Sequence, residues 1–133
     1  MREILFRGKD NSAEWRYGSY IEKTFGSFII KWFDNVCACE EYKVDSETVG
    51  QYTSLTDKNG TKIFEGDIIC REFHGDYYTG VVYFTDDFYG YSVTFIDGTT
   101  PEIMPLSEFH KTRYIEVIGN VFDNPELLEA TKC

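Results

Sequence analysis

The sequence predicts a mainly β protein, and three observations lead to this class. Apolar and polar residues alternate along most of the 133-residue chain, the pattern of strands that bury one face. Turn residues separate these runs at short intervals. Hydrophobic residues make up 42% and aromatic residues 17% of the chain, which is more than a disordered segment carries. We therefore expect an N-terminal β-meander, a C-terminal small SH3-like barrel and a short C-terminal helix.

The first half predicts the meander, which we assign to a subdomain of residues 1–48. The first strand places Ile4 and Phe6 on one side, and the second strand bends at Gly18. Asp45-Ser46-Glu47-Thr48 is typical of a turn or a helical cap. The four expected strands are Ile4–Phe6, Trp15–Ile21, Ser27–Phe33 and Val36–Tyr42.

The second half, residues 49–133, predicts the barrel. A tight turn at residues 57–60 and a Gly66-Asp67 corner punctuate the segment from Gln51 to Ile69. Pro125–Ala130 is the expected helix, with Asn124 as its N-cap. The strands expected after the turn are Thr61–Phe64, Asp67–Phe73, Tyr77–Phe84, Phe88–Ile96, Glu102–Phe109 and Tyr114–Phe122. The predicted core consists of Ile68, Val82, Phe84, Val93, Phe95, Ile115, Val117 and Val121.

The charge balance argues against direct binding of nucleic acid. The chain has 13 Lys and Arg against 23 Asp and Glu, a formal net charge of -10. A protein of this charge repels phosphates and lacks the counterion release that drives most nucleic-acid binding. An acidic surface also keeps a β-rich protein soluble. The alternative is an acidic mimic of nucleic acid that inhibits a DNA-binding protein.

The sequence predicts neither a membrane segment nor a signal peptide. No apolar run approaches the roughly 20 residues that cross a bilayer, and the N-terminus lacks a basic region followed by an apolar one. We therefore expect a cytoplasmic protein that does not bind a membrane.

The four cysteines do not have the spacing of a metal site. A structural zinc site commonly has two pairs of closely spaced ligands, whereas this chain has one Cys37-Ala38-Cys39 pair and the isolated Cys70 and Cys133. On a strand, Cys37 and Cys39 would share one face as small apolar residues. We predict no metal, no cofactor and, in a cytosolic protein, no stable disulfide.

Catalytic groups are equally hard to find. His74 and His110 lack a neighbouring nucleophile motif, and both are expected in loops or at strand ends. The carboxylates of Asp76, Asp86 and Asp87 lack the spacing of a calcium loop. The prediction is a protein without catalytic residues. A small-molecule enzyme with a site between the subdomains remains the alternative.

Aromatic residues crowd the segment between Asp76 and Ser92. Because neighbouring strand residues face opposite sides, these rings cannot all enter one core. Two explanations are open: cross-strand pairing on an exposed sheet, or a contact surface in which Tyr is enriched. Stacking of single-stranded bases is disfavoured because no basic groove accompanies the rings. The candidate partner-binding residues are Tyr77, Tyr78, Phe88, Tyr89 and Tyr91.

Four segments resemble the YopX-like family of phage and prophage proteins. They are the start Met1–Arg7, the run GQYTSLTDKNGTKIFEGDII from Gly50, the segment Pro105–Phe109, and the ending EVIGNVFDNPELL from Glu116. They occur in the family's order and span nearly the whole chain. The first turn, Arg7-Gly8-Lys9-Asp10, departs from the small-aromatic-Asp corner frequent in the family. The resemblance implies a mainly β phage protein in the cytoplasm of a bacterial host, of uncharacterised role and with no catalytic residues to transfer.

These observations favour a non-enzymatic phage or prophage accessory protein. The expected partner is another protein, or a second copy of the same chain in a homo-oligomer. The acidic mimic and the small-molecule enzyme are the two competing functions.

Overall fold

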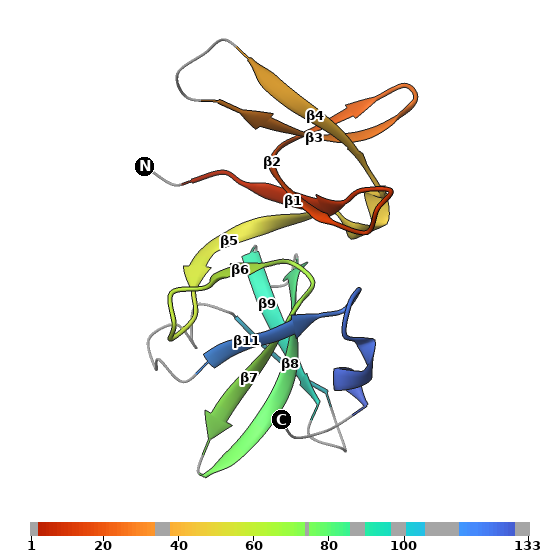
Figure 1. The fold of residues 1–133 in the computed structure, drawn as a ribbon. Helices are drawn as coiled ribbons and strands as arrows, with labels where there is room; N and C mark the ends of the chain where they lie inside the picture. The colour runs from red at the N-terminus through yellow and green to blue at the C-terminus, as the bar shows by residue number, and fades with distance from the viewer. Residues whose placement is uncertain are drawn as a thin grey trace. The chain divides into compact units, whose positions relative to one another are not determined.

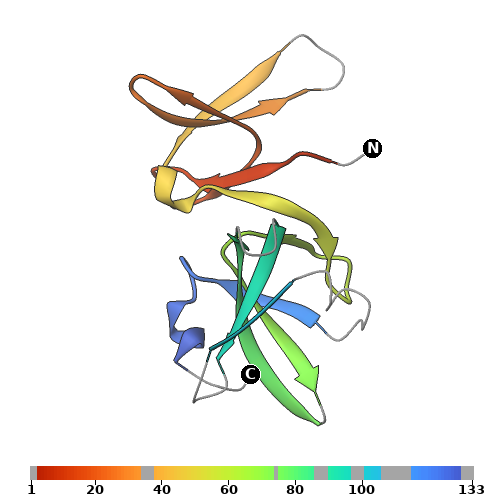
Figure 2. The same ribbon diagram turned by 180° about the vertical axis from the view of Figure 1, so that it is seen from behind.

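The computed structural model describes residues 3–33, 38–73, 75–85, 90–96, 101–105 and 115–129. The protein is mainly β, as the sequence predicts, and its strands form antiparallel sheets (Figures 1 and 2). The chain divides into two compact units, Met1–Tyr52 and Thr53–Cys133. The sequence placed this boundary after residue 48, whereas the division falls within the strand Gly50–Thr56.

Unit 1 is the expected meander, with one further strand. Its strands belong to a six-stranded sheet of order β4-β3-β2-β1-β5-β6, in which the neighbouring pairs from β4 to β5 are antiparallel. The expected turn after β4 is a short 3₁₀ helix, capped by the Asp45 side chain that accepts a hydrogen bond from the Glu47 N–H. The elements are β1 (Phe6–Lys9), β2 (Trp15–Lys23), β3 (Gly26–Trp32), β4 (Cys39–Val44), η1 (Ser46–Thr48) and β5 (Gly50–Thr56).

Close backbone approaches curl this sheet. A Cβ atom on Gly18 would lie 2.1 Å from the carbonyl oxygen of Ile30, so only glycine allows β2 to bend against β3 here. The far end of β4 returns to the end of β1, where Asp10 bridges Val44 and the Asp45 N–H donates to the Lys9 carbonyl over 2.8 Å. Figures 1 and 2 show β2, β3 and β4 curling away from β1 and back.

The inner side of the curl holds the core of unit 1. Ile29 is fully buried and Val44 nearly so, and the rings of Phe6 and Tyr20 lie 5.7 Å apart. All four belong to one side of the sheet, because the register pairs Tyr20 with Ile29 and alternation fixes the rest. Ile4, predicted on the same side as Phe6, is 69% exposed, and it precedes the first residue of β1.

Unit 2 is a five-stranded antiparallel sheet accompanied by the hairpin between β5 and β6. The sheet has the order β10-β9-β8-β7-β11. Its elements are β6 (Lys62–Phe64), β7 (Asp67–Phe73), β8 (Asp76–Thr85), β9 (Gly90–Ile96), β10 (Pro101–Pro105), β11 (Ile115–Asn120) and the 3₁₀ helix η2 (Pro125–Leu128). Its core cluster is Ile63, Ile69, Val82, Val93 and Ile115.

Most of the predicted core is confirmed. Ile68, Val82, Val93 and Ile115 are buried, Val117 packs against the core cluster, and Val121 is half-buried. Phe84 is a wrong prediction, because its side chain is 51% exposed. It shares the core-facing side of β8 with Val82, but it lies near the last pair of the β8–β9 ladder, beyond the buried part of the strand. The side chain of Phe95 lies outside the described residues.

Two aspartates from the long central motif fix the turns of unit 2. The Asp57 carboxylate accepts N–H hydrogen bonds from Asn59 and Thr61 through Oδ1 and from Val117 through Oδ2, all of 2.9 Å. The Asp67 carboxylate, 2% exposed as a residue, accepts the Phe64 N–H over 2.7 Å. Buried backbone donors need such acceptors. These acidic motif residues therefore serve the fold.

The expected C-terminal helix is a single 3₁₀ turn. Asn124 precedes it but makes no side-chain capping bond to it. The Asn124 Oδ1 instead accepts the Asn120 N–H over 3.3 Å, and a Cβ atom on Gly119 would come within 2.5 Å of that oxygen. None of the described helices is both long and apolar enough to cross a bilayer.

Candidate functional site

The structure separates the predicted partner-binding residues. Tyr77 is 48% exposed, whereas Tyr78 and Tyr91 pack against the core cluster of unit 2. The edge of Phe84 contacts Tyr91, with ring centroids 5.7 Å apart and planes at 82°. Phe88 and Tyr89 lie outside the described residues. Alternation explains the split, because Tyr78 and Tyr91 share the core-facing side of the sheet and Tyr77 faces the other side.

Large exposed apolar side chains are more numerous in unit 1. Among the described residues, six of the nine belong to it, and the other three are Tyr77, Phe84 and Phe122. The unit 1 members are Ile4, Tyr17, Ile21, Phe25, Trp32 and Phe33. Trp32 is 61% exposed and Phe25 is 69% exposed. Leaving large apolar side chains in water is unfavourable, so such high exposure is notable. An exposed group of this kind marks an interaction surface more often than a scattered one does.

The register gathers several of these side chains on the convex side of β2, β3 and β4. We call this side the outer face and define it by Ile21, Lys23, Phe25, Phe28, Ile30, Trp32, Glu41 and Lys43. Ile21 pairs with Phe28, and Phe28 pairs with Lys43, so these residues form one row across the strands. Ile30 pairs with Glu41 in the next row. Residues opposite each other on antiparallel strands have Cβ atoms about 5 Å apart, so the face is continuous.

Lysines frame the aromatic rings of the outer face. The Lys23 Nζ lies 4.8 Å from the Phe28 ring centroid and 5.9 Å from that of Phe25, and it forms an ion pair with Glu41. Phe25 meets Phe28 edge to face, with centroids 5.5 Å apart. Lys43 is exposed, opposite Phe28. The rings and ammonium groups hold one another in place by cation–π contacts.

Cations outnumber carboxylates on the same side of β1–β4. By alternation and register, the charged residues of β1–β4 on this side are Arg7, Lys9, Lys23, Lys43 and Glu41, a balance of +3. The Trp15 ring lies under both cations of β1, with Arg7 Cζ at 4.5 Å and Lys9 Nζ at 5.4 Å from its centroid. This charge contrasts with the formal -10 of the whole chain.

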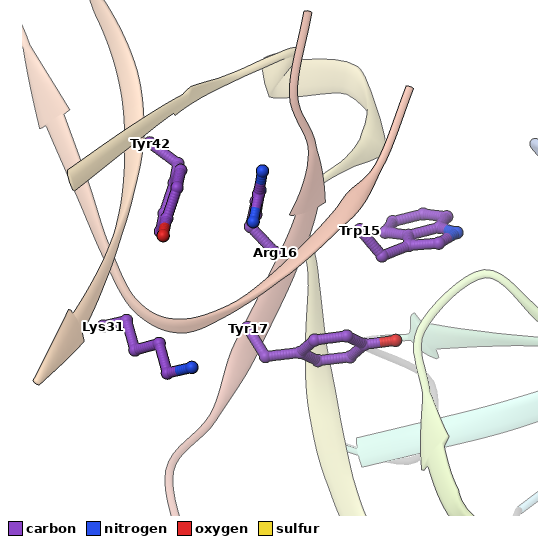
Figure 3. A pocket seen from close by; sticks show the side chains of 5 residues that line it. All are labelled: Trp15, Arg16, Tyr17, Lys31 and Tyr42. Atoms are coloured by element: carbon purple, nitrogen blue, oxygen red, sulfur yellow. The ribbon is translucent and has the colours of Figure 1, made fainter. Parts of the chain in front are cut away.

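A small pocket opens where β2 leaves β3 (Figure 3). It is lined by Trp15, Arg16, Tyr17, Lys31 and Tyr42 and has a cavity volume of about 150 Å³. In Figure 3 the Arg16 guanidinium lies alongside the Tyr42 ring, and its Cζ is 4.1 Å from the ring centroid. The ammonium group of Lys31 extends toward Tyr17 in the same view.

The polar groups around this pocket satisfy one another. Arg16 Nε donates to Asp10 Oδ2 over 2.7 Å, and Arg16 Nη2 lies 3.1 Å from Glu14 Oε2. Asp10 Oδ1 also accepts the N–H groups of Ser12 and Glu14. The Tyr42 hydroxyl donates to Glu40. Since the guanidinium already has two carboxylate partners, the pocket is better suited to fixing the curl of the sheet than to capturing an anion.

These contacts also shift ionisation. The hydrogen bond from the Arg16 side chain, followed by the backbone donor of Glu14, holds the pKa of Asp10 below its ordinary value. The same hydrogen bond raises the pKa of Arg16. The hydrogen bond with Glu40, together with burial, raises the pKa of Tyr42. All three directions favour the paired network at neutral pH.

The described cysteines and metal-ligand residues do not form a further site. Cys39 is exposed and free, so it is not a packed apolar residue. Cys70 is disulfide-bonded, contrary to the expectation of reduced thiols. No cluster of three or more His, Cys, Asp or Glu side chains suited to a metal ion occurs within the described ranges. His74 and His110 lie outside the described residues.

Sequence reasoning missed the outer face because it considered aromatic residues only where they are most crowded. Phe25 and Trp32 lie seven residues apart in the sequence, and their spacing does not indicate a shared surface. The uneven charge of the two units is the sequence signal that could have pointed to a cationic face on unit 1. Unit 1 has seven Lys and Arg against nine Asp and Glu, a balance of -2, whereas unit 2 has six against 14, a balance of -8.

Fold and surface together define an all-β protein of two antiparallel units, with a cationic aromatic face on the first. The model of the YopX protein family matches residues 5–129, and the chain belongs to this family. The resemblance seen in the sequence motifs is thereby confirmed.

A solved structure shares the fold. The crystal structure of protein EF1440 from Enterococcus faecalis is 24% identical in sequence, with a TM-score of 0.58. The match covers 96% of this chain and 99% of that one. No curated protein matches the chain. The arrangement of strands is therefore shared over the full length, while the role of the fold is not given by these relatives.

Proposed function

We propose that this protein is a non-enzymatic protein-binding module of a phage or prophage, and that it binds through the outer face of unit 1. The observation that carries the proposal is the exposure of Phe25 beside Lys23, and of Trp32 further along the same sheet face. Aromatic residues are enriched in the cores of protein interfaces, and tryptophan is enriched among the residues that contribute most to binding. The phage setting is what membership of the family supports.

The cost of leaving these rings in water supports a contact role. A buried aromatic side chain removes about 150–250 Å² from solvent, and Trp32 and Phe25 leave more than half of theirs exposed. At about 25 cal/mol per Å², covering these two exposed portions would contribute on the order of 5 kcal/mol before the costs of association. A bound protein would recover this free energy.

The test compares two double variants in affinity capture from lysogenic or infected cells. Trp32→Ser with Phe25→Ser removes two exposed rings of the outer face, and Phe84→Ser with Phe122→Ser removes two exposed rings of unit 2. We expect the first pair to lose the captured protein, or the homo-oligomer, and the second pair to retain it. Far-UV circular dichroism checks that both variants stay folded. Unchanged capture by the Trp32 and Phe25 variant would refute the proposal.

A second function, an acidic mimic of nucleic acid, is favoured by one observation. Unit 2 alone carries a balance of -8, and Glu72, Asp76, Asp123, Glu126 and Glu129 are exposed on it. Carboxylates on a folded surface attract the basic surface of a DNA-binding protein. A captured host protein that duplex DNA displaces would support this function, and one that DNA leaves in place would support the proposal above.

A further inference from the structure

Resting on the proposed function, we infer that the partner of the outer face is an acidic protein surface, and that a second copy of this chain supplies it. The supplying element is the closed end of the β7–β8 hairpin, defined here by Glu72, Asp76 and Tyr77. The contact thus joins unit 1 of one copy to unit 2 of another.

Charge complementarity is the first argument. The outer side of β1–β4 carries a balance of +3, whereas unit 2 carries -8. Two copies therefore attract when the outer face of one approaches unit 2 of the other, and two outer faces repel. Interfaces use such complementary potentials to select partner and orientation. A purely apolar patch would not distinguish between these arrangements.

The shape and composition of the hairpin end supply the second argument. β7 and β8 extend as a long hairpin (Figure 1), whose last pairs are Glu72 with Tyr77 and Phe73 with Asp76. Glu72 and Tyr77 therefore lie side by side on one face, and both are exposed, Tyr77 to 48%. On this face the hairpin end presents the Tyr77 ring beside the Glu72 carboxylate, whereas Asp76 belongs to the opposite side of the strands.

The two surfaces match in chemistry. The outer face presents the Phe25 ring beside the Lys23 ammonium group, with Lys43 on the same face, and the hairpin end presents Tyr77 beside the Glu72 carboxylate. Ring can pack on ring while Lys43 meets a carboxylate at the rim. Lys43 has no ion-pair partner among the described residues, unlike Lys23, which Glu41 already neutralises. Lys43 and Glu72 are therefore the charges to exchange.

Each copy carries both surfaces, so the contact has two possible symmetries. A reciprocal pair forms a closed two-fold dimer with two equivalent contacts, and a head-to-tail arrangement forms a ring or a filament. In either case the contact weakens with salt, because rim charges are screened over a Debye length of about 30 Å at 0.01 M and about 3 Å at 1 M.

The test is a charge exchange on the full chain, followed by sedimentation velocity and light scattering at low and high salt. Lys43→Glu alone and Glu72→Lys alone are each expected to weaken self-association about tenfold or more. Mixing the two single variants matches the charges at both contacts of a reciprocal dimer, because the unchanged Lys43 and Glu72 meet at one contact and the two introduced charges meet at the other, and it yields a mixed dimer. The double variant Lys43→Glu with Glu72→Lys is expected to self-associate like the wild type. Glu126→Lys, an exposed charge change outside the hairpin, is the control and is expected to have no effect.

The outcomes separate this inference from the proposed function. A wild type that is monomeric at low salt, or single variants that do not complement, would overturn the second copy as the partner. Capture of another protein that still depends on Trp32 and Phe25 would then leave the proposed function standing. If the wild type does not self-associate and capture does not depend on Trp32 and Phe25, the inference and the proposed function are both refuted. Salt-sensitive association with complementation would support both.

Discussion

The Asp57 carboxylate offers the sharpest test of how the long family motif folds unit 2. It accepts two N–H groups of its own turn, from Asn59 and Thr61, through Oδ1 and the N–H of Val117 on β11 through Oδ2. Asp57→Asn keeps a carbonyl oxygen for the turn but places an NH₂ group opposite the Val117 N–H. The substitution therefore removes one charge-assisted bond and leaves a donor facing a donor.

The expected cost is about 1.5–3 kcal/mol, the range for a hydrogen bond to a charged group. Asp57 is 7% exposed, so water cannot easily replace the lost acceptor. With a urea m-value of about 2 kcal/mol per M, the unfolding midpoint falls by about 1 M while m stays constant. Far-UV circular dichroism is the appropriate signal, because both tryptophans, Trp15 and Trp32, belong to unit 1.

Asp45→Asn is the matched control. Asp45 caps η1 through a single 3.0 Å bond from the Glu47 N–H to Oδ1, which an asparagine oxygen can also accept. We expect this variant to unfold within about 0.5 kcal/mol of the wild type. Amide exchange gives a second signal, in which the Val117 amide should exchange faster in Asp57→Asn. An Asp57→Asn protein as stable as the Asp45→Asn protein would refute this reasoning.

Two further predictions concern unit 1. Gly18→Ala forces a methyl group to 2.1 Å from the Ile30 carbonyl oxygen and should lower the free energy of unfolding by about 3 kcal/mol or more. The comparison variant is Gly60→Ala in unit 2, where the methyl group meets open space at a φ of +82°, and it should cost about 1 kcal/mol. Equal urea midpoints for the two variants would contradict this prediction. Because the Arg16 side chain lowers the folded pKa of Asp10 below its usual 3.8, the pair stabilises the protein above that pH and loses its effect as pH falls through the folded pKa. Asp10→Asn should therefore flatten the fall in thermal midpoint below pH 3.8, and an unchanged acid profile would count against the pair.

Turn chemistry made much of unit 2 predictable. The Asp57-Lys58-Asn59-Gly60 turn and the Gly66-Asp67 corner both occur as expected, and β7 has the predicted bounds Asp67–Phe73. In each case the information is local, because a turn residue is selected by its own φ or by a hydrogen bond within a few residues. The bend at Gly18 was also predicted, although its cause, the Ile30 carbonyl, lies on another strand.

The candidate site could not be predicted in the same way. Alternation placed Phe84 on the correct side of β8, but exposure depends on how far the neighbouring strands extend, and the ladder ends next to it. The same limit affected the tyrosine cluster, where Tyr78 and Tyr91 pack inward and Tyr77 does not. Crowding along the chain is therefore a poor guide to a surface in space.

By itself the sequence determined the fold class, the family, the turns and the strand positions of this protein, because these depend on residues close together in the chain. Only the tertiary structure decided which rings are covered and which charges gather on one face. Lys23 and Lys43 share the outer face with Phe28 because β2, β3 and β4 pair in one register. That register depends on how the three strands bury their apolar sides together and on the turns between them, and a one-residue slip would move every side chain of a strand to the other face.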